Sequence, residues 1–429
     1  MIRSILAVIA SLLMTTVALA QDAPETTVIH AGWLLAVPGQ APQAEQSIVI
    51  IGERIDRIED GYVEIDGATM IDLSDQYVLP GLIDSHVHLL SELNPERRLQ
   101  NVTFSSADWA LDGVRNARRT LMAGFTSVQD VGGNLEAIVA LRDAQRDGDI
   151  DGPRMRVSGP AVTPTGGHGD INGYNEDIMH AFSSQSACNG PDDCRRAVRE
   201  LVRGRVDLIK ITATGGVLSQ TAAGTEQQFF DDELDSIMEA ARMMGRYVTA
   251  HAHGVTGINS AIDAGIHSIE HGTYLDDESI RLFRANNVYL VPTLLAGATV
   301  ARIAEEADWM TPEVRQKSLD VGPLMLDMAR RAHEGGVMIA FGTDTGVSRH
   351  GDNAQEFPLL IEAGLTPMEA IVSATVTASE HLQMSDRIGT LEAGKFADII
   401  AVDENPWEDI SALLDVDFVM QGGTVHKNQ

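Results

Sequence analysis

Eight short apolar runs alternate with helix-like stretches through the middle of the chain, and this alternation constrains the fold more than any other feature. Candidate strands lie near Leu82 and over residues 125–128, 155–157, 208–211, 247–250, 268–270, 288–291 and 338–341. Candidate helices lie among them, for example over residues 107–123, 232–245 and 323–335. Repeated strand and helix units predict a parallel sheet with helical crossovers.

Eight such units predict an α/β fold of one kind, a closed (β/α)8 TIM barrel with its active site at the carboxyl ends of the strands. A doubly wound open sheet is the alternative. No Gly-x-Gly-x-x-Gly follows the first strand, which counts against an open sheet of the dinucleotide-binding type.

Both ends of the chain are rich in short β-prone segments. These lie over residues 27–30, 47–51 and 63–65 and over residues 397–402, 416–420 and 422–425. Neither end has enough strands for a core of its own. We therefore expect residues 21–80 and 388–429 to pair as one small β-sandwich domain beside a barrel domain of residues 81–387.

The first twenty residues have the composition of a secretory signal. Arg3 precedes an apolar run over residues 5–17, and Ala-Leu-Ala follows at residues 18–20. The run is too short for a comfortable membrane span. This pattern predicts a signal peptide over residues 1–20 and an exported protein, periplasmic or secreted, with a retained membrane anchor as the alternative.

The net charge of −31 at pH 7 excludes some classes of partner. Repulsion disfavours nucleic acids and anionic membrane surfaces. Cys188 and Cys194 flank an Asn-Gly-Pro turn. In an oxidising compartment they could form a disulfide, and two free thiols are the alternative.

Histidines, one lysine and one aspartate recur at the ends of the candidate strands. His86 and His88 are one residue apart on a strand, so their side chains share a face and could hold one metal ion. Lys210 lies inside an apolar strand, where a lysine is costly unless it is paired or chemically changed. Three further candidates end later strands, namely His251, His271 and Asp344. Each could be structural alone, but together they predict a metal site.

The segments that carry these residues resemble those of the amidohydrolase superfamily. The matching segments are residues 80–88 (PGLIDSHVH), Lys210, residues 251–254 (HAHG), residues 268–272 (SIEHG), residues 342–344 (GTD) and residues 389–398 (GTLEAGKFAD). The last of these matches the segment that re-enters the small β domain. Within the superfamily, the chain is most similar to the branch of prolidase-like dipeptidases and ochratoxin-hydrolysing amidases.

The resemblance implies two metal ions per subunit, usually zinc. The implied ligands are His86, His88 and Asp344 for the first metal, and His251 and His271 for the second. Lys210, carboxylated by carbon dioxide, would bridge the two. Paired metals lower the pKa of a shared water and polarise a carbonyl, and Asp344 would pass the proton of that water to the leaving nitrogen.

The implied reaction is hydrolysis of an amide, in a dipeptide, an N-acyl amino acid with a free C-terminal carboxylate, or an ochratoxin-like amide. His168 lies in a glycine-flanked loop where similar dipeptidases place a carbonyl-binding histidine. His253 is a candidate for substrate contact. The alternatives are that His168 orders a flexible loop and that His253 makes a loop hydrogen bond.

Two further pairs are candidates for substrate binding. Arg349 and His350, which follow the eighth strand, could receive the carboxylate, and Val217 and Leu218 could line a side-chain pocket. Ordinary loop packing is the alternative for the apolar pair.

The first alternative function is a cyclic-amide hydrolase of the imidazolonepropionase type, but such enzymes typically use one metal and no bridging lysine. The second is a binding protein on an inactive barrel, but the complete set of ligands counts against it. Relatives often form homo-oligomers, so the resemblance implies a homo-oligomer here.

Overall fold

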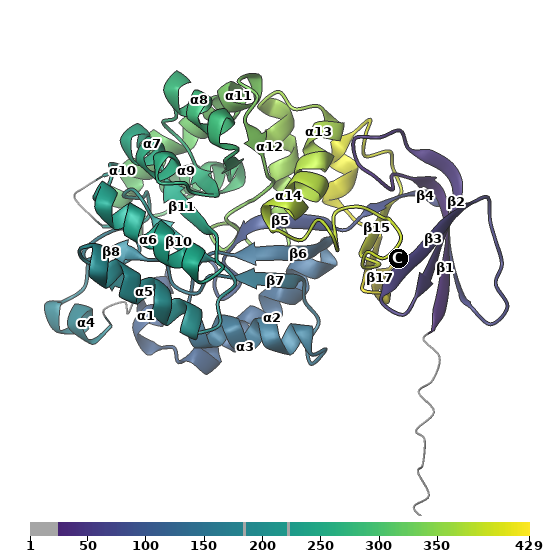
Figure 1. Ribbon diagram of the computed structural model, residues 1–429, viewed down its shortest axis with the longest axis horizontal. Coiled ribbons are helices and arrows are strands. Elements are labelled where there is room, and N and C mark those ends of the chain that lie inside the picture. The colour runs from purple at the N-terminus through teal and green to yellow at the C-terminus, as the bar shows by residue number, and fades with distance from the viewer. Residues whose placement is uncertain (1–24, 183–185, 221–223) are drawn as a thin grey trace, which may run out of the picture.

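The computed structural model describes residues 25–182, 186–220 and 224–429. The predicted signal peptide lies outside these residues. Figure 1 shows a β-rich part, which contains β1–β4, beside a larger body of strands flanked by helices. Within the described ranges, no helix has both the length and the apolar character needed to cross a membrane.

Two parallel sheets form the centre of the larger body. The first contains, in order, β5 (Leu82–Val87), β6 (Phe125–Asp130) and β7 (Arg154–Val157). The second contains, in order, β10 (Ile209–Thr212), β11 (Val248–Ala252), β12 (Ser268–His271), β13 (Tyr289–Val291) and β14 (Met338–Ile339). All eight predicted strands are confirmed. Most of their residues are buried, which explains the unbroken apolar runs.

Backbone hydrogen bonds connect the two sheets at both margins. Asp344 N donates to His86 O at 2.8 Å, which joins the segment after β14 to β5. Val162 N donates to Lys210 O at 2.8 Å, which joins the segment after β7 to β10. The molecule therefore has an α/β fold, and complete closure into an eight-stranded barrel stays a prediction.

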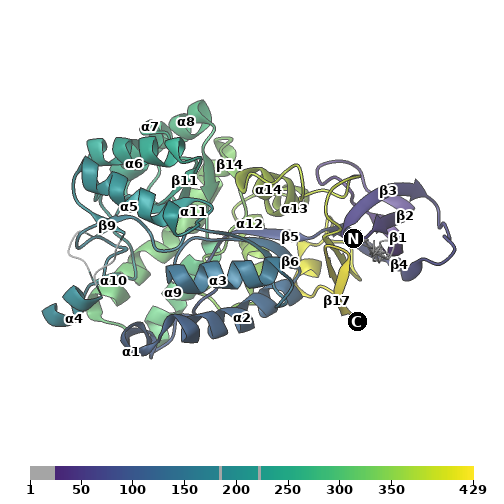
Figure 2. The same ribbon diagram turned by 60° about the horizontal axis from the view of Figure 1, so that its bottom comes forward.

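Helices lie around these sheets, and Figure 2 shows α2 and α3 on one side of the central strands and α5 to α8 on the other. They are α1 (Arg97–Thr103), α2 (Ser106–Met122), α3 (Leu135–Arg146), α4 (Glu176–Ala181), α5 (Pro191–Arg203), α6 (Asp231–Met243), α7 (Val255–Asp263), α8 (Asp277–Asn286), α9 (Leu294–Glu306), α10 (Pro312–Val321), α11 (Met325–Glu334), α12 (Glu356–Glu362), α13 (Pro367–Val372) and α14 (Ala378–His381). The three predicted helices correspond to α2, α6 and α11. Helix α2 begins after Ser105, which forms a capping box with Asp108.

Strands from both ends of the chain share one sheet with the order β17-β16-β15-β4-β1-β2-β3. Its strands are β1 (Thr26–Leu34), β2 (Gln43–Ile51), β3 (Arg54–Asp60), β4 (Thr69–Pro80), β15 (Ile399–Val402), β16 (Phe418–Gln421) and β17 (Thr424–Asn428). Strand β4 pairs antiparallel with β15, which places Ile399 opposite Pro80. The domain boundaries at residues 80 and 388 stay predictions.

The hydrogen bonding corrects the predicted sandwich of two sheets, because all seven strands belong to one. This sheet curls until its far strand meets the segment before β15, where Ile55 N donates to Lys395 O at 3.0 Å. Bulges in the β1–β4 and β2–β3 pairs favour such bending. The curled sheet encloses one core, in which Ile48 and Ile50 belong to the same cluster as Phe418.

The strand predicted over residues 63–65 is wrong, because this segment is not part of any ladder. Val63 N donates to Ser47 Oγ at 3.0 Å, and His30 Nε2 donates to Val63 O at 2.9 Å. Side chains thus satisfy this backbone where a neighbouring strand would otherwise do so. The edge strand is β3, whose many charged residues concealed its strand character.

Candidate active site

Histidine and aspartate side chains converge at the carboxyl ends of the parallel strands. The ligand atoms of His86, His88 and Asp344 lie within 4.8 Å of one another. The described residues contain a second such group, formed by His251, His253 and His271. The ring centroids of His86 and His271 are 5.3 Å apart, so the two groups are adjacent.

The first group joins the end of β5 to the segment after β14. Asp344 Oδ1 lies 3.4 Å from His86 Nε2 and 3.1 Å from His88 Nε2. Although burial opposes it, His86 and His88 hold the pKa of Asp344 well below its usual value. Asp344 also has a φ of 55°, a left-handed conformation that is uncommon for non-glycine residues and recurs at functional sites. The carboxylate is therefore ionised and held against both imidazoles.

The second group has His251 on β11, His253 directly after β11 and His271 at the end of β12. Ala252 is paired with His271 in the sheet, so His251 and His271 are one position apart in register, with rings 4.6 Å apart. The ring of His253 stacks on that of His271 at 4.9 Å. The structure therefore brings His253, which we expected to contact substrate, into a group of candidate metal ligands.

Hydrogen bonds indicate which ring nitrogen of His271 and of His253 remains available for a metal. His271 Nδ1 donates to Thr293 Oγ1 at 2.7 Å, because that hydroxyl itself donates to Pro292 O, and His253 Nδ1 is hydrogen-bonded to Thr273 Oγ1 at 2.8 Å. In both rings, Nε2 takes no part in these bonds and can bind a metal. Burial lowers the pKa of His253 to about 3, so this imidazole is neutral near pH 7 and can act as a ligand.

Lys210 lies beneath the two groups. It is paired with Thr249 in the β10–β11 register, two positions before the pairing of Thr212 with His251. Lys210 is 3% exposed, and its Nζ has no hydrogen-bond partner among the described residues. Burial lowers the pKa of Lys210, against the opposing carboxylates of Glu270 and Asp344. This orphaned nitrogen fits a site that accepts an additional anionic group between the histidines.

Glu270 is a site residue to which the sequence analysis gave no role. Its fully buried carboxylate accepts a hydrogen bond from His86 Nδ1 at 2.6 Å, one from Ser268 Oγ at 3.0 Å and one from Thr249. Burial raises the pKa of Glu270, but Lys210 and His86 bring it below the usual value. Metal-binding histidines commonly donate their second N–H to such a carboxylate. The sequence feature that could have marked Glu270 as a site residue was its position directly before His271, inside a buried strand.

The loop that carries His168 covers the second group. The ring of His168 stacks on that of His251 with centroids 4.2 Å apart. A Cβ added to Gly216 would lie 2.3 Å from the His168 ring, so only glycine fits there. Burial and then the charge of Lys317 lower the pKa of His168 to about 4, so its ring is neutral near pH 7.

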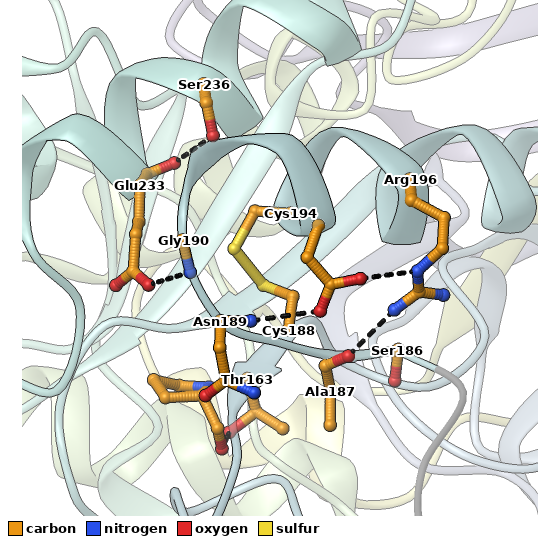
Figure 3. The surroundings of a disulfide bond; sticks show 12 residues. Thr163, Ser186, Ala187, Cys188, Asn189, Gly190, Cys194, Arg196, Glu233 and Ser236 are labelled. Carbon is orange, nitrogen blue, oxygen red and sulfur yellow. Dashed lines mark hydrogen bonds and ion pairs between the residues drawn. A yellow bond between two sulfur atoms is a disulfide. The ribbon is translucent and has the colours of Figure 1, made fainter.

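The predicted disulfide between Cys188 and Cys194 is confirmed. It lies at the end of the His168 loop, where β9 (Ala187–Cys188) pairs with β8 (Thr163–Pro164), and it ties β9 to α5 (Figure 3). Asn189 Nδ2 donates to Thr165 Oγ1 at 2.8 Å. The disulfide and this pairing therefore hold both ends of the loop.

The remaining predicted substrate residues differ in their surroundings. Val217 is buried in the main core, and Leu218 packs against two core clusters. Arg349 is exposed. His350 is 2% exposed, and its Nε2 donates to the backbone of Ser91 at 3.1 Å. The structure therefore shows His350 in a hydrogen bond with the loop at Ser91.

Lys317, on α10, is the second site residue that the sequence analysis missed. Its Nζ donates to Gly216 O and to Ser219 O, both at 2.6 Å. No sequence signal marked it, because it lies on an outer helix and away from every strand end.

Comparisons with known proteins agree with this geometry. A sequence model of the amidohydrolase family matches residues 77–427. The ochratoxinase of Aspergillus niger is 30% identical over 433 residues, which covers 95% of this chain and 88% of that protein.

Two solved structures are similar over most of the chain. A Xaa-Pro dipeptidase with bound methionine in its active site superposes with a TM-score of 0.89 at 40% identity, covering 94% of this chain and 100% of the other. A prolidase in complex with N-methylphosphonate-L-proline superposes with a TM-score of 0.86 at 32% identity, with the same coverage.

The family is generally metal-dependent, and imidazole and carboxylate groups such as those described are suitable ligands for zinc. The family match and the hydrolases among the relatives count against an inactive binding protein. The chain belongs to the amidohydrolase family and is a hydrolase that acts on amide bonds.

Proposed function

We propose that the chain hydrolyses the amide bond of dipeptides or N-acyl amino acids that carry a free C-terminal carboxylate. The observation that carries this proposal is the pair of adjacent histidine groups around the orphaned Nζ of Lys210. The names of the similar proteins support the substrate class, since ochratoxinase, Xaa-Pro dipeptidase and prolidase are among them. The methionine and the L-proline derivative bound in these two structures also carry carboxylates.

The proposal includes two zinc ions per chain. The residues that would hold them are His86, His88 and Asp344 on one side, His251 and His271 on the other, and Lys210 between. Burial favours the neutral amine of Lys210, whose nitrogen can form a bond to carbon dioxide and release a proton to solvent, and the carbamate would supply one negative charge shared by two oxygens as ligands. The metals, when bound, would lower the pKa of a shared water and polarise the substrate carbonyl.

The side chains of the site then have distinct roles. Asp344, with Oδ1 between His86 and His88, would accept a proton from water and return it to the leaving nitrogen. His168 is neutral near pH 7 and would donate a hydrogen bond to the substrate carbonyl oxygen, which gains negative charge in the transition state. The contact of His168 with His251 places this donor beside the second group.

We also propose that the two parallel sheets close into a (β/α)8 barrel, that the chain is exported after removal of residues 1–20, and that it forms a homo-oligomer. The cross-sheet bonds at both margins support closure. The disulfide is consistent with an oxidising compartment. N-terminal sequencing of the exported protein and its mass in solution test the last two points.

A hydrolysis screen on zinc-loaded protein tests the function. The panel contains dipeptides, N-acyl amino acids, an ochratoxin-like amide and a cyclic imide. We expect turnover of several linear amides with free carboxylates and none of the cyclic imide. Opening of the cyclic imide alone would contradict the proposal and favour the imidazolonepropionase type of reaction.

A further inference from the structure

Helix α10 places one cation against the loop that follows β10. Lys317 is half-buried, and two of its three Nζ hydrogens are used by the carbonyls of Gly216 and Ser219 at 2.6 Å. Two hydrogen bonds fix the position of the nitrogen, which a flexible lysine side chain would not keep by itself. One donor remains for another partner.

This fixed cation lies close to the candidate active site. Gly216, which accepts one of the Lys317 bonds, packs directly against the ring of His168, and that ring stacks on His251. The charge of Lys317 also contributes to the lowered pKa of both His168 and His253. Lys317 therefore lies on the His168 side of the site.

Lys317 forms no ion pair with a described residue, and the charge of Glu313, one turn earlier on α10, acts on it only from a greater distance. No carboxylate of the described residues lies within 4.0 Å of Lys317 Nζ. Most ion pairs of the molecule join arginines to close carboxylates instead. In a chain of net charge −31, an unpaired cation beside the active site is unusual. The cations predicted from the sequence are less suitable, because Arg349 is exposed and His350 is bonded to Ser91.

We propose that Lys317 binds the C-terminal carboxylate of the substrate and thereby selects amides of α-amino acids. This inference rests on the proposed function. In such substrates the carboxylate is separated from the scissile nitrogen by one carbon atom. If His168 binds the scissile carbonyl of the substrate, the carboxylate lies within a few ångströms of that carbonyl. Lys317 lies on the same side of the site as His168. Lys317 is then a specificity-determining residue, while the proton transfers belong to Asp344.

The test compares one dipeptide with its C-terminal amide as substrates of Lys317→Met, Lys317→Arg and the wild type. Loss of one charge-assisted hydrogen bond should lower kcat/KM for the dipeptide by about 10- to 100-fold in Lys317→Met, mainly through KM. Turnover of the amide should stay within about twofold. Lys317→Arg keeps the charge and should recover part of the preference for the dipeptide. Arg315→Met, which removes an exposed cation from the same helix, is the matched control and should change neither substrate.

Two outcomes would overturn the assignment. Equal losses for both substrates would show that Lys317 only holds the loop at Gly216, and unchanged kinetics for both would show that it makes no contact with substrate. The proposed function fails separately, since it is contradicted only if wild-type protein hydrolyses none of the linear amides with a free carboxylate in the panel described above.

Discussion

At the scale of single residues, the site is built from conformations and burials that would be costly elsewhere. His271, Thr293 and Asp344 all have positive φ angles, and each either belongs to a histidine group or bonds to it. Such strain costs of order 1–3 kcal/mol per residue and persists where the surroundings enforce it. The strained residues therefore position the ligand atoms.

Lys210 provides the most specific residue-scale prediction. Lys210→Ala removes the group that would bridge the two metals, so the protein should lose bound metal and most of its activity. Short carboxylic acids such as acetate should restore part of both, because they can occupy the space of the carbamate. Metal analysis and amide hydrolysis with and without added acid measure this, and an unchanged metal content would remove the bridging role.

Glu270→Gln is expected to weaken metal binding without unfolding the chain. The amide keeps the size of the side chain but not the charge that orients His86. Loss of a carboxylate behind a histidine ligand typically costs 10–100-fold in metal affinity, and we expect about that loss in a chelator competition assay. Glu233→Gln, at a buried carboxylate whose hydrogen bonds are to Gly190 N and Phe230 N, is the control. Equal affinities in the wild type and in Glu270→Gln would contradict the role.

Sequence reasoning found some of these residues and not others for a physical reason. His86, His251 and Asp344 follow apolar strands, and parallel strands bring their carboxyl ends together whatever the loops do. Lys317 reaches the site from an outer helix, and only tertiary packing decides which face of α10 meets the loop of Gly216. Glu270 was visible, but only the structure shows that it touches His86.

At the scale of elements, the same contrast holds. The eight central strands were readable because buried parallel strands are continuous apolar runs. The edge strand β3 was not, because its exposed residues are charged and its pairing depends on β2. The single curled sheet could not be told from a sandwich, since the strand sequences are compatible with either pairing.

The disulfide supports an element-scale prediction. Replacing Cys188 and Cys194 by serine removes a short cross-link of sequence separation 6, which should lower the free energy of unfolding by about 2 kcal/mol. The His168 loop should also lose rigidity, so kcat should fall while the metal content stays unchanged. Thermal unfolding, metal analysis and kinetics measure these effects. Wild-type protein unfolded under reducing conditions should approach the stability of the variant. If the reduced wild type stays more stable than the variant, the stability loss does not come from the missing disulfide.

At the scale of the whole molecule, the ion pair of Arg154 with Asp398 helps to join the terminal sheet to the larger body. Arg154 of β7 makes two hydrogen bonds at 3.2 Å to Asp398, and Gly422 N donates to the same carboxylate at 2.8 Å. The Arg154 guanidinium also lies 3.7 Å from the ring centre of Phe396. These contacts make the terminal sheet a support for the first parallel sheet, which carries His86.

Asp398→Asn tests this connection. The Asp398 side chain is 5% exposed, so its removal leaves a largely buried arginine without a counter-charge, and we expect a loss of about 3 kcal/mol in the free energy of unfolding. Asp56→Asn breaks a surface pair in which the aspartate side chain is 40% exposed, and should cost less than about 1 kcal/mol. Urea unfolding of both variants measures the difference, and similar losses in the two would contradict the special role of Asp398.

The central claim is that both histidine groups act together as one metal centre for amide hydrolysis. It is tested most directly by removing all metal with a chelator and measuring dipeptide hydrolysis while zinc is added back in known amounts. We predict that activity is absent without metal, rises with added zinc and saturates at two zinc ions per chain. Metal-free protein that keeps its full activity on the dipeptide would contradict the claim.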